Sequence, residues 1–162
     1  LVNEGYDLII RIGALEDSGL IAKRLCDFPA HLCASPAFLK QYGTPKKPND
    51  LRQIPAVIYT NSSTGPMLEL SDPLGVKDTV ALKPAIFTNS IAMLLQSTIK
   101  GIGFAKLPAV FCQKYIKDGL LKTLLPNFTS MPQSGIFIIY PDRRHLPMKV
   151  RLFIDLMEKH LS

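Results

Sequence analysis

Cysteines are few in this sequence, and long apolar runs are absent. The three cysteines, Cys26, Cys33 and Cys112, are odd in number and have no CxxC spacing, which argues against both a disulfide framework and a zinc site. No apolar stretch approaches the roughly 18 residues of a membrane-spanning helix. The first residues, Leu1–Glu4, have neither the basic nor the apolar region of a signal peptide. We therefore predict no membrane association and a location in the reducing cytoplasm.

Motifs of catalysis and of cofactor binding are also missing. The sequence contains no GxSxG, GxxxxGKS/T or HExxH, and the histidines His31, His145 and His160 are not at metal-ligand spacing. Gly101-Ile102-Gly103 lacks the third glycine of a dinucleotide fingerprint and follows a predicted helix, so a helix stop followed by close packing is the simpler interpretation. We predict no enzymatic activity, no metal site and no cofactor.

What the chain does contain is enough apolar material for a folded core. Of its 162 residues, 47% are hydrophobic and 20% are charged, which suits one compact domain or two small lobes. The formal charge of +6 favours solubility and weak attraction to polyanions. The basic residues are scattered in pairs such as Lys46–Lys47, without interleaved aromatic residues, so direct DNA contact by this chain is not indicated.

Helix and strand signals alternate along the chain. Asp7–Gly13 is a nearly continuous apolar run that ends at glycine, which is typical of a buried strand in a parallel sheet. Ser35 suits an N-cap, Pro36 the first helical position and Gly43 a helix end, so a short helix is predicted between them.

The remaining elements follow the same kind of signal. Further strands are expected at Ala56–Tyr59, Met67–Leu70, Thr79–Leu82, Ala85–Phe87, Ile102–Ala105 and Ile136–Tyr140, a helical turn at Asn49–Arg52, and further helices from Ser90 to Lys100, from Pro108 and from Pro147. Alternation at this pace predicts an α/β fold around a largely parallel sheet.

Six phrases, in this order, resemble the effector-binding domain of LysR-type transcriptional regulators. They are Gly5-Tyr6-Asp7-Leu8-Ile9-Ile10-Arg11-Ile12-Gly13, Leu32-Cys33-Ala34-Ser35-Pro36-Ala37-Phe38-Leu39, Gly43-Thr44-Pro45, Thr88-Asn89-Ser90, Gly101-Ile102-Gly103-Phe104-Ala105-Lys106-Leu107-Pro108, and the stretch from Tyr140-Pro141-Asp142 to Phe153-Ile154-Asp155. Each phrase alone is weak, but their order and separations are specific, and together they cover nearly the whole chain. The middle section, residues 60–86, fits less well because it lacks a tryptophan that relatives often have near Met67.

The resemblance implies a two-lobed α/β fold similar to type 2 periplasmic binding proteins. The first lobe would comprise residues 1–33 and 137–162, and the second residues 34–136. Family members normally carry further residues before the equivalent of Gly5, which complete the first lobe, and a winged helix-turn-helix with a linker helix. We therefore expect a first lobe that is incomplete in this sequence, with an exposed sheet edge.

The candidate effector site lies at the turn Thr88-Asn89-Ser90. A helix start offers free backbone N–H groups and the positive end of the helix dipole, which attract anions. The alternative is that Asn89 or Ser90 merely caps its own helix. The resemblance favours effector contact here, and it adds Phe104 and the pair Ile12 and Gly13, which would line the opposite wall of the cleft. From the residues alone, Ile12 would be core and Gly13 a turn.

Two further groups have open alternatives. Arg11 could pair with a carboxylate effector or form a structural ion pair. Cys26 and Cys33 are close enough in sequence for a redox sensor, but inert buried thiols are the simpler explanation.

We therefore interpret the chain as a regulatory domain that senses a small anionic or polar metabolite between two lobes. Its partners would be that effector and further copies of itself, as a dimer or tetramer that pairs through a surface such as Pro108–Lys117. DNA would be bound only through the N-terminal domain of such regulators. The alternatives are a solute-binding protein or a small-molecule enzyme on the same scaffold.

Overall fold

The computed structural model describes residues 6–13, 21–60, 65–131, 134–140 and 146–161. The chain divides into two compact units, of which unit 1 comprises Leu1–Pro29 and Gln133–Ser162, and unit 2 comprises Ala30–Pro132. The units change after Pro29 and after Pro132, in each case four residues before the predicted lobe boundaries after residues 33 and 136. The lobe boundaries themselves stay a prediction. The sequence also predicts a turn-rich loop at 61–66 and a polar joint at 141–145. Residues 61–64 of the loop and the whole joint lie outside the described residues.

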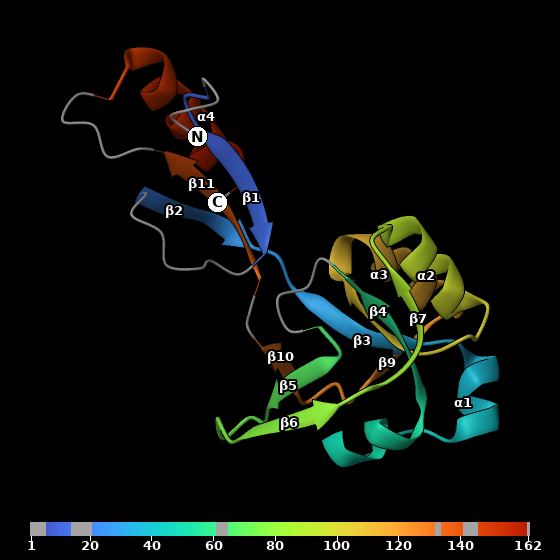
Figure 1. Cartoon of the computed structure of the whole chain (residues 1–162). Helices are drawn as coiled ribbons and strands as arrows, with labels where there is room; N and C mark the ends of the chain where they lie inside the picture. The colour runs from blue at the N-terminus through green and yellow to red at the C-terminus, as the bar shows by residue number, and fades with distance from the viewer. Residues whose placement is uncertain (1–5, 14–20, 61–64, 132–133, 141–145, 162) are drawn as a thin grey trace. The chain divides into compact units, whose positions relative to one another are not determined.

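Unit 2 is built on strands from distant parts of its sequence (Figure 1). They are β3 (Ala30–Ala34), β4 (Pro55–Tyr59), β7 (Lys83–Thr88), β8 (Ala105–Pro108) and β9 (Lys122–Leu124). Strand β3 pairs antiparallel with β8 and β9, whereas β4 and β7 are parallel. A parallel bridge between Ala56 and Phe104 joins β4 to the start of β8.

The prediction of a largely parallel sheet is therefore wrong, although the α/β composition is right. Of the strand pairs that the structure describes, only β4–β7 is parallel, apart from the single bridge at Phe104. A continuous apolar run signals a strand that is covered on both faces, but it carries no information on the direction of the neighbouring strands. In β3, Leu32, Cys33 and Ala34 are all buried within antiparallel pairs.

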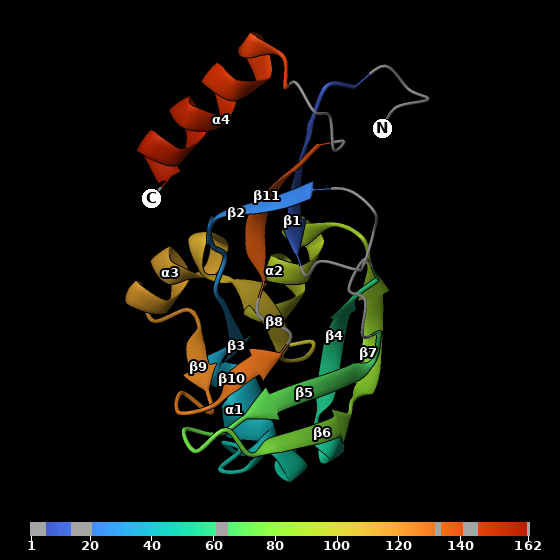
Figure 2. The same cartoon turned by 90° about the vertical axis from the view of Figure 1, so that its left-hand side faces the viewer.

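Two cores lie on the two faces of the unit 2 sheet. On one face, α2 (Ile91–Ile99) and α3 (Ala109–Lys117) pack over Cys33, Val57, Ala105 and Leu107. On the other, Leu32, Ala56 and Phe104 pack against α1 (Pro36–Tyr42), the 3-10 helix η2 (Pro48–Gln53) and a small antiparallel sheet. That sheet has the order β10-β5-β6, from Thr129–Met131, Met67–Ser71 and Lys77–Ala81 (Figure 2).

The predicted helix punctuation in unit 2 is confirmed. The Ser35 Oγ accepts a hydrogen bond from the Phe38 N–H at 3.3 Å, and Pro36 opens α1. At the other end, Gly43 has φ +84° and donates its N–H to the Leu39 carbonyl at 2.9 Å. The expected turn at Asn49–Arg52 lies within η2, and α2 ends at Lys100 as predicted.

Gly103 allows the close packing that its position after α2 suggested. A Cβ built on this residue would lie 2.9 Å from the Pro55 oxygen and 3.1 Å from the Ala56 carbonyl carbon. The neighbouring Phe104 donates its N–H to the Pro55 oxygen at 3.0 Å and accepts from the Val57 N–H at 2.8 Å. Glycine is therefore required for β4 and β8 to approach each other.

Unit 1 contains a three-stranded antiparallel sheet with the order β1-β11-β2, from Ile9–Gly13, Gly135–Tyr140 and Ile21–Asp27. Helix α4 (Met148–Leu161) packs on it through Val150 and Ile154, which lie against Leu25 and Ile138. The spacing of apolar residues in the sequence predicts one packed face for this helix, made of Val150, Phe153, Ile154, Met157 and Leu161. All of these pack in this core except Phe153, which is 36% exposed.

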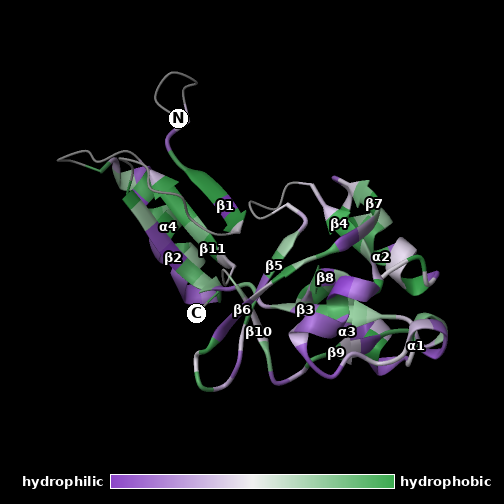
Figure 3. Ribbon diagram, turned by 60° about the horizontal axis from the view of Figure 1, so that its bottom comes forward, coloured by the Kyte–Doolittle hydropathy of each residue, from purple (hydrophilic) through white to green (hydrophobic). Residues whose placement is uncertain are grey.

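Two features of unit 1 differ from the predictions. Strand β1 is an edge strand that is antiparallel to β11, and Ile10 and Ile12 are 43% and 55% exposed, so the expected buried parallel strand is wrong. Strand β2 was not predicted, because its sequence interrupts the apolar pattern with Lys23 and Arg24 and its pairing is shifted near Ile136. The contrast is visible in Figure 3, where β2 is mostly hydrophilic and β11 mostly hydrophobic.

In the part of the chain that the structure describes, no helix has both the length and the apolar composition of a membrane crossing. Over the same residues, His, Cys, Asp and Glu side chains form no cluster of three or more that could hold a metal ion.

Candidate functional site

The turn Thr88-Asn89-Ser90 joins the end of β7 to the start of α2. The Thr88 side chain is buried, whereas Asn89 and Ser90 are exposed. The Thr88 Oγ1 accepts from the Ser90 N–H at 3.1 Å, and the Ser90 Oγ accepts from the Met93 N–H at 3.3 Å. Ser90 therefore caps its own helix, which was one of the two alternatives for this turn. Asn89 is not the capping residue.

This capping leaves several hydrogen-bond donors for a ligand. A hydroxyl that accepts one bond keeps its own proton to donate, and this applies to both Thr88 and Ser90. The N–H groups in the first turn of a helix have no intrahelical acceptor, which leaves those of Ile91 and Ala92 available. The helix dipole adds partial positive charge at the same end. The turn can therefore bind a carboxylate or another oxygen acceptor.

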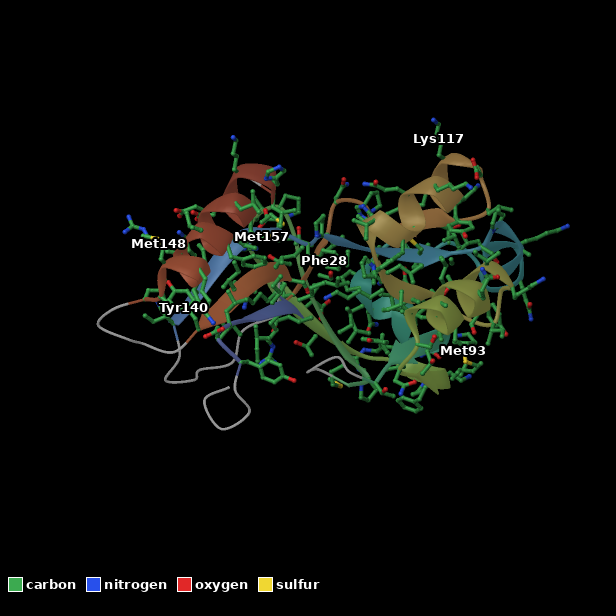
Figure 4. All side chains as sticks on the ribbon, turned by 90° about the horizontal axis from the view of Figure 1, so that it is seen from above. Phe28, Met93, Lys117, Tyr140, Met148 and Met157 are labelled. Atoms are coloured by element: carbon green, nitrogen blue, oxygen red, sulfur yellow. The ribbon has the colours of Figure 1, made fainter. Side chains whose placement is uncertain are left out.

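The surroundings of this turn are open and partly apolar. Met93, in the first turn of α2, is 51% exposed and lies on the outer surface of unit 2 (Figure 4). Phe87, which precedes Thr88 in β7, is 56% exposed. Exposed apolar side chains therefore flank the turn in the sequence on both sides.

Phe104 belongs to unit 2 but is not exposed. Its side chain is 1% exposed and packs in the core with Leu32 and Ala56. Its backbone N–H and carbonyl are both used in the junction between β4 and β8. In this structure the Phe104 ring is therefore a core side chain. Its predicted role as an effector contact is not tested and stays a prediction.

Ile12 and Gly13 belong to unit 1, at the end of edge strand β1. Ile12 is exposed rather than core, and Gly13 has φ +136° and pairs with Gly135. Arg11 is exposed and lies opposite Phe137 in the strand register. Because the structure describes each unit separately, the assignment of Ile12 and Gly13 to an effector site stays a prediction.

Sequence reasoning did not identify Lys106, the half-buried lysine of β8. Its neighbours Ala105 and Leu107 are 1% and 0% exposed. Burial lowers the pKa of the Lys106 ammonium below its usual value. The signal was available in the sequence, as a single charge inside the short apolar strand Ala105-Lys106-Leu107.

The cysteines differ in accessibility. Cys33 and Cys112 are both 0% exposed and lie in the core beneath α2 and α3, and Cys26 is half-buried. Burial raises the pKa of the Cys33 and Cys112 thiols, so they stay protonated at neutral pH. These are the properties of inert buried thiols, the simpler of the two alternatives for Cys33.

We expect Cys26 to react with a maleimide reagent at pH 7.5 at least tenfold faster than Cys33 or Cys112 in the folded protein. The thiolate is the reactive form, and burial suppresses both its formation and its access to the reagent. Mass spectrometry of peptides from quenched time points measures the three rates, and labelling in 6 M urea is the control, where the rates should converge. Equal labelling of Cys33 and Cys26 in the folded state would contradict the burial of Cys33.

Comparison with known proteins places these features in a family. All residues, 1–162, match the family described as LysR substrate binding domain. The HTH-type transcriptional regulator PtxR of Pseudomonas aeruginosa is 33% identical over 162 residues, which are 100% of this chain and 51% of the relative. The HTH-type transcriptional activator AaeR of Escherichia coli is 33% identical over 155 residues, covering 96% of this chain and 50% of the relative. The chain thus spans about half the length of these curated relatives.

Solved regulatory domains have the same fold. That of AphB from Vibrio vulnificus matches with a TM-score of 0.77 and 27% identity over 97% of this chain and 76% of that chain. The regulatory domain of CrgA from Neisseria meningitidis matches with a TM-score of 0.76 and 25% identity over 100% of this chain and 78% of that chain. The predicted fold, similar to type 2 periplasmic binding proteins, is thereby confirmed. The chain belongs to the LysR substrate binding domain family, the effector-binding regulatory domain of LysR-type transcriptional regulators.

Proposed function

We propose that this chain senses a small molecule for a bacterial transcription regulator of the cytoplasm. The proposal is carried by the full-length match to a substrate-binding domain, and the donor-rich start of α2 supports it. The relatives are named as HTH-type transcriptional regulators, which favours this function over an exported solute-binding protein or an enzyme. DNA contact would then be made by a part of the regulator that this chain does not include.

The effector would be bound by the hydroxyls of Thr88 and Ser90, the Asn89 amide and the first-turn N–H groups of α2. Ile12 and Gly13 of unit 1 would be further effector contacts. The donors are complementary to a small anionic or polar effector.

Regulation would be a population shift between two conformations of the domain. The effector acts only if it binds one conformation more tightly than the other, since equal affinity for both would shift nothing. Self-association would transmit the change to a second copy, and the exposed Val110 and Phe111 of α3, at 63% and 45%, are candidate contact residues.

A metabolite screen with matched variants tests the proposed site. Thermal-shift screening of the protein expressed from its complete gene identifies a ligand, and calorimetry measures its affinity. Asn89→Ala is expected to raise the Kd about tenfold, which corresponds to about 1.4 kcal/mol for one lost hydrogen bond. Ser90→Ala should also weaken binding, and it should cost about 1 kcal/mol of stability because the helix cap is lost.

The control is Gln96→Ala, an exposed position near the other end of α2. It should change neither affinity nor stability noticeably. If both Asn89→Ala and Ser90→Ala bind the ligand as the unaltered protein does, the turn is not part of the effector site.

A further inference from the structure

Charge is divided unequally between the two units. Unit 2 has 11 lysine and arginine residues against 5 aspartate and glutamate residues, a net charge of +6, whereas unit 1 has 8 residues of each sign and is neutral. The whole formal charge of the chain, +6, therefore belongs to unit 2. Solubility would be served by a net charge on either unit. The division thus points to a function of the positive charge in unit 2.

Several strands begin at the same end of the unit 2 sheet. Lys83, the first residue of β7, pairs with Pro55, the first residue of β4, and the two strands are parallel. Strand β8 also begins here, because the Phe104 N–H just before it donates to the Pro55 oxygen. Strand β3 is antiparallel to β8 and so ends here, and β9 begins opposite its last residue, with Lys122 beside Ala34.

Two helices also end at this end of the sheet. Lys100 is the C-cap of α2, and a Cβ on the following Gly101 would lie 3.2 Å from the Oγ of Ser35, which directly follows β3. Lys117 is the last residue of α3, five residues before β9 begins. Figure 4 shows its side chain pointing away from unit 2 into solvent.

Together these segments and the stretch that leads into β4 present six exposed lysines, which we call the basic end: Lys46, Lys47, Lys83, Lys100, Lys117 and Lys122. Among the described side chains, none of the six forms a salt bridge. The nearby Asp50 carboxylate accepts the backbone N–H groups of Lys46 and Lys47, at 2.9 and 3.1 Å. Asp118 follows Lys117 as the C-cap of α3. Positive charge is therefore in excess at the basic end.

Helix dipoles account for only part of this cluster. Lys100 and Lys117 stand at the C-terminal ends of α2 and α3, where the dipole stabilises a cation. Lys83 and Lys122 open strands instead, so no helix end explains them. Like charges on one surface repel each other, and a polyanion relieves that repulsion. The basic end therefore suits the binding of a polyanion.

The width of the basic end is compatible with duplex DNA. The strands lie in the order β7-β4-β8-β3-β9. Four spacings of about 4.8 Å separate the strands that Lys83 and Lys122 open, about 19 Å in all. Over that length duplex DNA carries about 11 phosphates. Contacts from flexible lysines to phosphates carry no base information, so such binding does not depend on sequence.

The basic end is separate from the candidate effector turn. Lys83 opens β7 and Thr88 closes it. Five residue steps of about 3.3 Å place the two residues about 17 Å apart along the strand. A ligand at the turn therefore leaves the basic end free.

We propose that the basic end of unit 2 binds the phosphate backbone of duplex DNA without sequence preference. The inference rests on the proposed function, in which another part of the regulator recognises its DNA site and so holds a duplex near this chain. A weak second contact gains from that high local concentration. The sequence shows these lysines only as scattered residues and pairs, because their gathering depends on the directions of the strands.

The test measures the salt dependence of DNA binding by the protein expressed from its complete gene. Two fluorescent duplexes of about 40 base pairs and unrelated sequence are titrated at 50 to 200 mM KCl, and fluorescence anisotropy gives the affinity. The triple variant Lys83→Gln, Lys117→Gln and Lys122→Gln should bind both duplexes at least about fivefold more weakly at 100 mM KCl. The slope of log affinity against log salt should become less steep by about 2–3, since each lost phosphate contact contributes about 0.9.

The matched control removes three charges from exposed lysines outside the basic end, as Lys77→Gln, Lys149→Gln and Lys159→Gln. It should leave affinity and slope nearly unchanged. A second triple variant, with arginine at positions 83, 117 and 122, keeps the charge and should bind as the unaltered protein does. Thermal midpoints of all three variants should match that of the unaltered protein, because the replaced side chains are exposed.

Binding by the glutamine variant of the basic end that equals binding by the unaltered protein would overturn the inference. An equal loss in the control variant would also overturn it, since net charge and not position would then be responsible. Weaker binding of poly-glutamate with unchanged binding of both duplexes would indicate an acidic protein partner in place of DNA. If the unaltered protein binds neither duplex at any salt concentration, the proposed function fails together with this inference.

Discussion

Replacement of Phe104 by alanine is expected to lower the free energy of unfolding by about 3–5 kcal/mol. The ring is 1% exposed and packs within the core that contains Leu32, Ala56 and Leu70. Truncation removes most of a buried aromatic side chain and leaves a cavity that the surrounding strands fill only in part, because they are held by their own hydrogen bonds. Urea denaturation followed by far-UV circular dichroism measures the change, since the chain has no tryptophan.

Phe111→Ala on α3 provides the matched control. Phe111 is 45% exposed, and the same truncation there should cost less than about 1 kcal/mol. Equal costs at the two positions would contradict the core position of Phe104. A second variant, Phe104→Leu, distinguishes a loss of core packing from a loss of effector binding. Leucine is larger than alanine and keeps most of the buried volume of the side chain. If that variant remains stable and loses effector affinity, the predicted effector contact of Phe104 gains support.

Gly103→Ala is expected to destabilise the protein by about 2–3 kcal/mol, although it adds only one methyl group. That methyl would lie 2.9 Å from the Pro55 oxygen and 3.1 Å from two backbone carbons of β4. Backbone atoms in a sheet cannot rotate away as a flexible side chain can. The strands must separate, which weakens the bond from the Phe104 N–H to Pro55 and the bond from the Val57 N–H to Phe104.

Gly119→Ala distinguishes this clash from ordinary backbone strain. Gly119 has φ +74°, and no atom lies within 4 Å of the position of its missing Cβ. Alanine there should cost only about 1–2 kcal/mol, from the left-handed backbone conformation. Chemical denaturation of both variants under the same conditions measures the difference. A Gly103→Ala variant as stable as the unaltered protein would show that β4 and β8 are not in close contact at this residue.

Local chemistry explains the predictions that the structure confirms. The start of α1 was predictable because a serine and a proline stand in the positions that a helix start favours, and Ser35 does cap Phe38. The start of α2 was predictable for the same reason at Ser90. In α4, the three- and four-residue spacing of Val150, Ile154 and Met157 identified the face that packs. Each of these signals lies within a few residues of the feature it predicts.

The candidate site was predictable only in part. The polar turn Thr88–Ser90 was identified, and the structure shows that Thr88 and Ser90 cap backbone N–H groups while Asn89 remains exposed. The sequence predicted a short buried strand that contains Phe104, but it did not show the position of that ring beside Leu32 and Ala56 or the half-burial of Lys106. Both depend on which strands flank β8, and those strands come from residues about 50 to 75 positions earlier in the chain.

The sequence by itself determined the family, the α/β composition and the ends of several helices, because order of motifs, capping residues and periodicity are properties of neighbouring positions. Only the tertiary structure decided that β1 is an exposed antiparallel edge, that β2 pairs despite its charges, and that Gly103 lies against β4. The physical reason is that strand direction and burial depend on partners distant in the chain. The same apolar run satisfies a parallel or an antiparallel neighbour equally well.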